Sequence, residues 1–152
     1  MTSTGQPPVD GRVVALAHYA ARALLEGALA RHGVTFEQSV ALRVVAVAGG
    51  SLSREKLVAG VVGSLKADES AVRDVIEELA AARLVEEDPA EASRVRLTGS
   101  GREAHANTAA EGVEIAARLY AGIPAEELAV TGRVLRLVTE RANAAAADVQ
   151  AH

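Results

Sequence analysis

The sequence predicts a mainly α-helical fold with one small β-hairpin. Over most of its 152 residues the apolar side chains recur at three- and four-residue spacing, which is the period of a helix with one buried face. One short stretch, residues 94–98, instead alternates charged and apolar residues in the pattern of a half-buried strand. Aromatic residues make up only 2% of the chain, so we expect a core of Ala, Val and Leu side chains.

The chain is organised around residues 52–101. Asp68 is placed to cap a helix, whose buried face is predicted from Val72, Val75, Ile76 and Leu79. Leu84 and Val85 predict a first strand, which the polar loop DPAEAS connects to the second. A helix capped by Ser53, a long turn (AGVVGSLKAD), the second helix and this hairpin are the elements of a winged helix-turn-helix. In that module the second helix enters the DNA major groove.

Helices are also predicted before this module. Asp10 caps a helix that ends at Gly33 and is apolar over most of its circumference. Such a helix needs cover on two sides, which we assign to its own domain and to a second subunit. Thr35 and Gln38 match a capping box for the next helix, which the glycine pair 49–50 ends. Its predicted buried residues are Val40, Leu42, Val44, Val45 and Val47.

Two more helices are predicted after the module. The first ends at Gly122, and Pro124 begins the second. A heptad spacing predicts a helix–helix seam, and hence a homodimer, from Leu128, Thr131, Leu135, Val138 and Ala142. Residues 1–9 are expected to be disordered, and the tail beyond Ala142 to fray. The predicted organisation is one domain, 1–152, with a helical dimerisation region at 10–50 and 103–148 and a winged helix-turn-helix module at 51–102.

The composition argues against several classes of protein. Without cysteine we expect no disulfide, thiol switch or cysteine-ligated zinc, and the four histidines lack the spacing of a metal site. Neither a signal peptide nor an apolar run of membrane-span length is recognised, which predicts a cytoplasmic protein without a membrane partner. No GxSxG, phosphate-binding loop or paired His–carboxylate motif is found, so we expect neither catalysis nor a cofactor.

The order of the elements and several local motifs resemble the MarR family of bacterial transcriptional regulators. The resemblance covers residues 13–142 and rests on HGVTFEQSVALRVV, LSREKL, SAVRDVIEELAAARLVEE, RVRLTGSGREA and AGIPAEEL. Its most specific part is Leu97, Thr98, Gly101 and Arg102. It implies a homodimer with interlocked terminal helices and two winged modules that read a near-palindromic site on double-stranded DNA. It also implies release of the DNA by a small aromatic or phenolic ligand.

Two features depart from that family. Its wing carries an Asp-x-Arg motif, whereas the corresponding positions here are Pro89 and Glu91. Beside Arg73, the predicted recognition helix carries four acidic residues, Glu69, Asp74, Glu77 and Glu78. Residues 52–103 hold eight basic and eleven acidic residues, a net charge of −3, within a chain of net charge −4. Such a module must segregate its charges in order to attract phosphate.

Eight residues are candidate DNA contacts. Arg73 is the best candidate for a base edge, because Arg paired with guanine is the commonest specific contact. The alternative is a surface charge paired with Glu69 or Glu77 on the same helix. Arg94 and Arg96 are two apart on a strand and therefore share one face. The remaining candidates, which are also explained as caps or solvated surface residues, are Ser53, Arg54, Lys56, Lys66 and Ser70.

Three residues of the first helix are candidate ligand contacts. His18, Tyr19 and Arg22 lie where the resemblance places the family's ligand pocket. The alternative is that they are polar residues on the face that meets the second subunit.

The sequence thus predicts a DNA-binding transcriptional regulator, and specifically a homodimeric repressor of a near-palindromic operator that a small molecule releases. The alternative is a dimer of the same fold that has lost operator binding and serves as a ligand-binding or protein-interaction module. The acidic recognition helix and the missing wing arginine favour this alternative.

Overall fold

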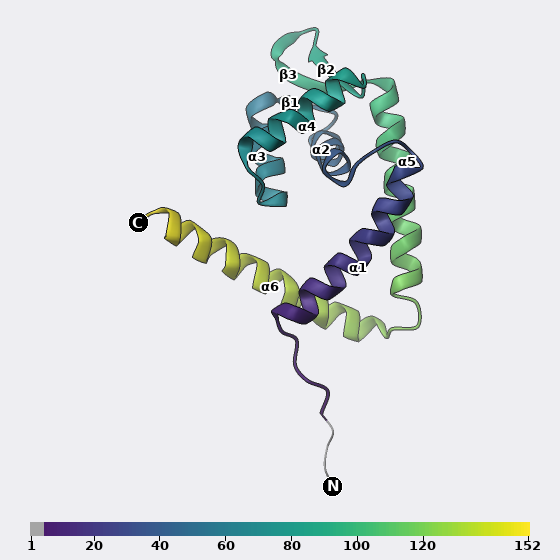
Figure 1. Ribbon diagram of the computed structural model, residues 1–152, viewed down its shortest axis with the longest axis vertical. Coiled ribbons are helices and arrows are strands. Elements are labelled where there is room, and N and C mark those ends of the chain that lie inside the picture. The colour runs from purple at the N-terminus through teal and green to yellow at the C-terminus, as the bar shows by residue number, and fades with distance from the viewer. Residues whose placement is uncertain (1–4) are drawn as a thin grey trace. The chain divides into compact units, whose positions relative to one another are not determined.

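The computed structural model describes residues 5–152, so part of the expected N-terminal disorder concerns residues that lie outside it. Residues 5–10 have no regular secondary structure. The predicted mainly α fold with a small sheet is confirmed (Figure 1). Its elements are α1 (Gly11–Ala30), α2 (Phe36–Val47), β1 (Ser51–Ser53), α3 (Arg54–Leu65), α4 (Glu69–Ala81), β2 (Val85–Asp88), β3 (Glu91–Leu97), α5 (Gly99–Leu119) and α6 (Ala125–Gln150).

The chain divides into two compact units, Met1–Ile115 and Ala116–His152. The first contains the winged helix-turn-helix elements together with α1, α2 and most of α5, and the second consists of the end of α5 and α6. The predicted single domain, with dimerisation and DNA-binding regions, stays a prediction.

The helix α2 is central to the first unit (Figure 1). It begins at the predicted capping box, in which Thr35 accepts a hydrogen bond from the backbone of Gln38 and the Gln38 side chain accepts one from the backbone of Thr35. It packs against α3, α4 and the sheet, and the fully buried side chains of this core include Leu42, Val45, Leu57, Val61, Val72, Ile76, Leu79 and Val95. The prediction of burial is wrong for Val47, which is 82% exposed, because it is the last residue of α2 and leads directly into the exposed turn at residues 48–49.

The sheet has three strands instead of the predicted two. Its order is β1-β3-β2, and both pairs are antiparallel. β1 was not predicted, because Ser51–Ser53 is too short to show an alternating pattern. The predicted six-residue loop DPAEAS is also wrong, since Asp88 belongs to β2 and Glu91–Ser93 belong to β3. Asp88 makes this tight turn possible by accepting a hydrogen bond from the backbone N–H of Ala90 (2.9 Å).

The turn between α3 and α4 is short, which corrects the predicted long turn. α3 continues through AGVVGSL, and the connection to α4 is Lys66–Asp68. Lys66 has a left-handed backbone (φ 54°), which ends α3 in the manner of a C-cap residue. Asp68 occupies the N-cap position of α4, as predicted. Its side chain makes no capping hydrogen bond, so the predicted contact is absent.

A compact joint connects the sheet to α5. The Thr98 hydroxyl donates to the carbonyl of Arg83 (2.7 Å) and accepts from the backbone N–H of Gly101 (2.9 Å). Gly101 lies so close to the backbone of Leu84 that a Cβ there would overlap the Leu84 carbonyl. Arg102 donates to the carbonyl of Leu97 (3.2 Å). The segment that carries the family resemblance therefore fixes the start of α5 against the hairpin.

The helix α1 presents an apolar surface that the described residues leave largely uncovered. Ala28 and Leu29 are its buried residues, whereas Val13, Leu16, Tyr19 and Leu24 are exposed. By length and composition it is apolar enough to span a membrane, which corrects the expectation that no such run exists. One helix of this kind is weak evidence for a membrane span, because a core helix of a soluble protein meets the same criteria.

In the second unit, α6 continues to Gln150, well beyond the predicted fraying point at Ala142. It has no buried residue within the described chain, and its exposed apolar residues include Val130, Leu137, Val138 and Val149. Pro124 was predicted to be the first helical residue, but it is the N-cap residue of this helix, which begins one position later at Ala125.

Candidate nucleic-acid interface

The outer face of α4 is the face that a winged helix-turn-helix presents to DNA. Val72, Ile76 and Leu79 are buried against α2 and α3 at helical spacing. This packing directs Ser70 outward, where it is exposed, and leaves the side chain of Arg73 39% exposed. The amphipathic pattern that buries α4 therefore also determines which of its polar side chains reach solvent.

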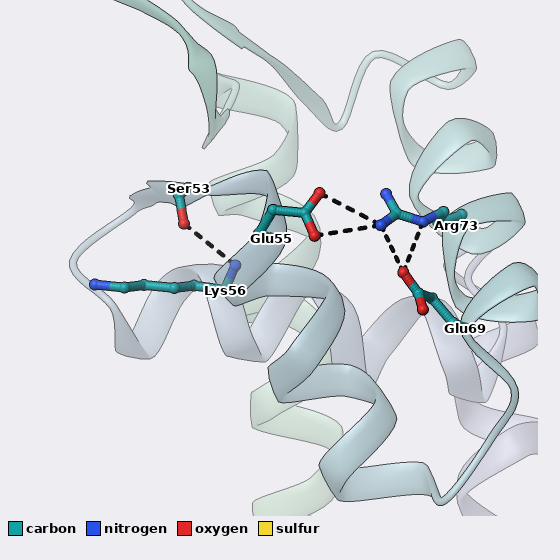
Figure 2. A network of polar contacts seen from close by, with 5 residues as sticks. All are labelled: Ser53, Glu55, Lys56, Glu69 and Arg73. Carbon is teal, nitrogen blue, oxygen red and sulfur yellow. Dashed lines mark hydrogen bonds and ion pairs between the residues drawn. The ribbon is translucent and has the colours of Figure 1, made fainter.

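Arg73 is held by two carboxylates (Figure 2). Its Nη2 and Nε donate to Oε1 of Glu69 at 2.6 and 3.2 Å, which confirms the predicted pair along α4. Nη2 also donates to both carboxylate oxygens of Glu55, each at 3.3 Å. The hydrogen bonds to Glu69 and then to Glu55 raise the pKa of Arg73 above its ordinary value, so the side chain stays cationic.

Glu55, which contacts Arg73, was not among the predicted site residues. It lies on α3, 18 residues before Arg73, so helical spacing gives no signal for the contact. The alternative partner considered from spacing, Glu77, makes no ion pair with Arg73 among the described residues. The Arg73–Glu55–Glu69 cluster, defined by these three side chains, joins the first turns of the two helices.

The start of α3 places three of the predicted contacts together. Ser53 caps the helix, with its hydroxyl accepting from the backbone N–H of Lys56 (3.2 Å). The Lys56 side chain is exposed and extends away from Arg73 (Figure 2), and Arg54 is half-buried. The ammonium group of Lys56 therefore lies away from the two carboxylates that hold Arg73. Lys66, in the turn before α4, donates to the carbonyl of Gly63 (2.7 Å) and serves as a C-cap.

The two wing arginines make contacts inside the sheet. Arg94 donates to the hydroxyl (3.2 Å) and the carbonyl (2.9 Å) of Ser51, which ties β3 to β1. Arg96 donates to Glu86 on β2 (2.9 Å). Both side chains remain partly exposed, on the shared face that their spacing predicts. The turn at the wing tip is formed by Pro89 and Ala90, between Asp88 and Glu91.

A separate open groove of about 460 Å³ lies between the end of α1 and the start of α2. The guanidinium of Arg22 stands 4.2 Å from the centre of the Phe36 ring and donates to Glu26 (2.8 Å) and Glu37 (2.9 Å). Of the three predicted ligand residues, Arg22 lines this groove. His18 and Tyr19 lie exposed on α1, with their ring centroids 5.6 Å apart.

Comparison with known proteins identifies the fold. No protein-family model and no curated protein matches the sequence. Among solved structures, a MarR-family transcriptional regulator from Rhodococcus sp. has a TM-score of 0.72 at 18% identity, over 85% of this chain and 92% of that one. A variant of E. coli MarR in complex with operator DNA has a TM-score of 0.69 at 20% identity, over 84% and 91%.

A third match is the Bordetella bronchiseptica protein BpsR, whose DNA binding is regulated by 6-hydroxynicotinic acid. It has a TM-score of 0.68 at 26% identity, over 85% of this chain and 97% of that one. The chain therefore has the winged-helix fold that is seen in these MarR-family structures. The resemblance read from the sequence motifs is confirmed at the level of the fold.

Proposed function

We propose that this protein is a DNA-binding transcriptional regulator that acts in the cytoplasm as a homodimer. The observation that carries the proposal is the arrangement of α3, α4 and the hairpin, because it is shared with a MarR variant that was solved on operator DNA. In this arrangement α4 is the element that enters the major groove, and the start of α3 and the hairpin meet the backbone.

The eight predicted contacts divide into two roles under this proposal. Arg73 reads a base edge from the first turns of α4, and Ser70 lies beside it on the exposed surface. The other six, Ser53, Arg54, Lys56, Lys66, Arg94 and Arg96, lie on α3, its flanking turns and the wing, where they contact phosphate. Such contacts fix the register of the protein on the duplex and supply most of the affinity.

A homodimer is supported by the apolar residues that stay exposed on α1 and α6. Apolar surface that stays exposed on a helix often marks an interaction site in a soluble protein. A two-fold dimer presents two recognition helices, which makes the site near-palindromic. We infer repression from this binding mode, since a dimer bound across a promoter blocks its use.

The groove at Arg22 and Phe36 is the proposed effector site. Its volume lies in the range of small-molecule sites, and it offers an aromatic ring and a cation. A small aromatic or phenolic acid fits this chemistry, because its carboxylate can replace Glu26 or Glu37 at the guanidinium. Binding would favour one dimer geometry and so change the separation of the two recognition helices. BpsR, which shares the fold, is regulated by such an aromatic acid.

The test is a binding titration of the purified protein against the DNA that flanks its own gene, at two salt concentrations, with a scrambled duplex as control. A regulator binds the flanking duplex more tightly than the scrambled one, and log K falls with log salt by about 0.9 for each phosphate contacted. Arg73→Glu should abolish the preference while leaving the helical circular dichroism unchanged. Equal binding of Arg73→Glu and wild type would remove Arg73 from the interface.

A second candidate function is favoured by the charges of the module. Arg73 faces two carboxylates, Arg96 faces one, and Arg94 is bound to Ser51, within a stretch of net charge −3. A dimer of this fold that had lost operator binding would serve as a ligand-binding or protein-interaction module. Absence of binding to both duplexes at low salt would favour this second function.

A further inference from the structure

The Arg73–Glu55–Glu69 cluster occupies the part of the guanidinium that guanine recognition requires (Figure 2). A bidentate contact to guanine uses two neighbouring N–H groups, on either the Nε/Nη2 edge or the Nη1/Nη2 edge. Glu69 accepts from both nitrogens of the first edge, and Glu55 accepts from Nη2. Because Nη2 belongs to both edges, Arg73 cannot read a guanine until at least one carboxylate withdraws.

The two carboxylates are not equivalent. Glu69 precedes Arg73 by four residues on the same helix and contacts the Nε/Nη2 edge, so it can stay bound while the Nη1/Nη2 edge faces a base. Glu55 reaches across from α3, and its side chain is 76% exposed. It is therefore the carboxylate that a base displaces. Displacing an exposed partner of this kind costs less than about fivefold in affinity.

The same cluster discourages contact with phosphate. Two carboxylates around one guanidinium leave an excess of one negative charge at the start of α4. Non-specific binding depends on phosphate neutralisation, so this excess weakens it on every sequence. A bidentate contact with a correctly placed guanine favours binding over the wrong base by about tenfold or more. This gain in affinity exceeds the loss that results from displacing Glu55.

We propose that Glu55 is a specificity-determining residue of the DNA interface, which withholds Arg73 from phosphate and releases it to guanine. The inference rests on the proposed DNA-binding function. It assigns a role to a residue of α3 that need not touch a base. It also explains how an acidic module would bind its own site while binding other DNA sequences weakly. It also predicts that each half-site contains a guanine opposite Arg73.

The first step of the test is to select duplexes from a random-sequence library with the wild-type protein. Dissociation constants are then measured for the selected duplex and a scrambled one with wild type, Glu55→Gln and Glu77→Gln. Glu77→Gln is the matched control, because it removes the same charge from the exposed surface of α4 without touching Arg73. Glu55→Asp, which keeps the charge but shortens the reach, is the second variant, and circular dichroism checks that each variant is folded.

We expect Glu55→Gln to raise affinity for the scrambled duplex by about threefold to tenfold over the control, with a smaller change on the selected duplex. The ratio of the two affinities therefore falls, and Glu55→Asp gives an intermediate ratio. In an Arg73→Ala background the effect of Glu55→Gln should shrink to that of Glu77→Gln, because Glu55 acts through Arg73.

The possible failures are distinguishable. If the wild type selects a sequence but Glu55→Gln behaves like Glu77→Gln, the role of Glu55 is overturned while the regulator stands. If the wild type selects no sequence, the proposed DNA-binding function fails and the role of Glu55 fails with it. A selected half-site without a conserved guanine would also overturn the role assigned to Arg73 and Glu55.

Discussion

Gly101 shows how a single residue position can be fixed by backbone contact. It is buried, and the carbonyl of Leu84 occupies the space that any Cβ would need. Its backbone N–H also donates to Thr98, whose hydroxyl donates in turn to Arg83. Glycine is required here by the close approach of two backbones, since its conformation lies in the ordinary helical range of α5.

Replacing Gly101 by alanine should destabilise the protein by roughly 3 kcal/mol, because the rigid backbone of Leu84 must move to make room. Urea unfolding followed by circular dichroism measures the change. Gly112→Ala is the matched control in the same helix, where a Cβ meets no atom within 4 Å. That substitution should stabilise the protein by about 0.5–1 kcal/mol. Equal stability of the two variants would contradict the packing at Leu84.

Residue-scale features were predictable where they are local in sequence. The capping box at Thr35, the cap at Ser53 and the Arg73–Glu69 pair follow from spacings of three or four residues. Glu55 was not predictable, because its contact with Arg73 exists only once α3 and α4 have packed. The contacts of Arg94 with Ser51 were missed for the same reason, since they depend on the pairing of β1 with β3.

At the scale of elements, the turn after α1 is attached to α5 by one carboxylate. Glu111 accepts a hydrogen bond from His32 (3.2 Å) and from Arg31 (3.3 Å to each oxygen). The hydrogen bond from His32, followed by that from Arg31, lowers the pKa of Glu111 below its ordinary value of 4.5. A carboxyl whose pKa is lowered by folding stabilises the folded state in its ionised form.

Glu111→Gln should therefore make the protein less stable at neutral pH. The difference from wild type should persist at all pH values above 4.5 and disappear as the pH falls through the lowered pKa of Glu111. Unfolding free energies measured from pH 7 down to acid test this. Glu114→Gln, an exposed position on the same helix, is the control that should show little of this dependence. A constant difference between wild type and Glu111→Gln at every pH would rule out the ionised contact.

Long periodic helices were predicted well, and short or boundary features were not. The buried face of α4 is as predicted at Val72, Ile76 and Leu79, because helical periodicity extends over the whole element. β1 has only three residues and was missed, and the length of α3 was underestimated because its second half contains Gly60 and Gly63. Packing against α2 compensates for the weak helix propensity of those glycines.

At the scale of the whole molecule, α1 and α6 leave apolar surface exposed on each of the two units. A helix without any buried residue, as α6 is within the described chain, gains little stability from its own unit. The heptad spacing of Leu128, Leu135 and Val138 predicts a seam with a second copy of the chain. Self-association is therefore expected to contribute to folding as well as to function.

We expect wild type to sediment as a dimer at micromolar concentration. Val138→Glu should weaken self-association by at least about tenfold, because it would place an unpaired charge in an apolar seam. Sedimentation velocity over a concentration series measures this. Ala144→Glu, which lies outside the heptad positions of the same helix, should leave the dimer intact. A folded wild-type monomer at these concentrations would remove the dimer from the proposed function.

Ser53 belongs to two elements at once, since it pairs with Arg94 as the last residue of β1 and caps α3, which begins at the next residue. The sheet and α3 are thus connected directly through Ser53, without a linker between them. In the proposed dimer, this coupling predicts that β1, β3 and α3 move together as one rigid body. We therefore expect the proposed effector to change the distance between the two modules while the DNA contacts within each module stay the same.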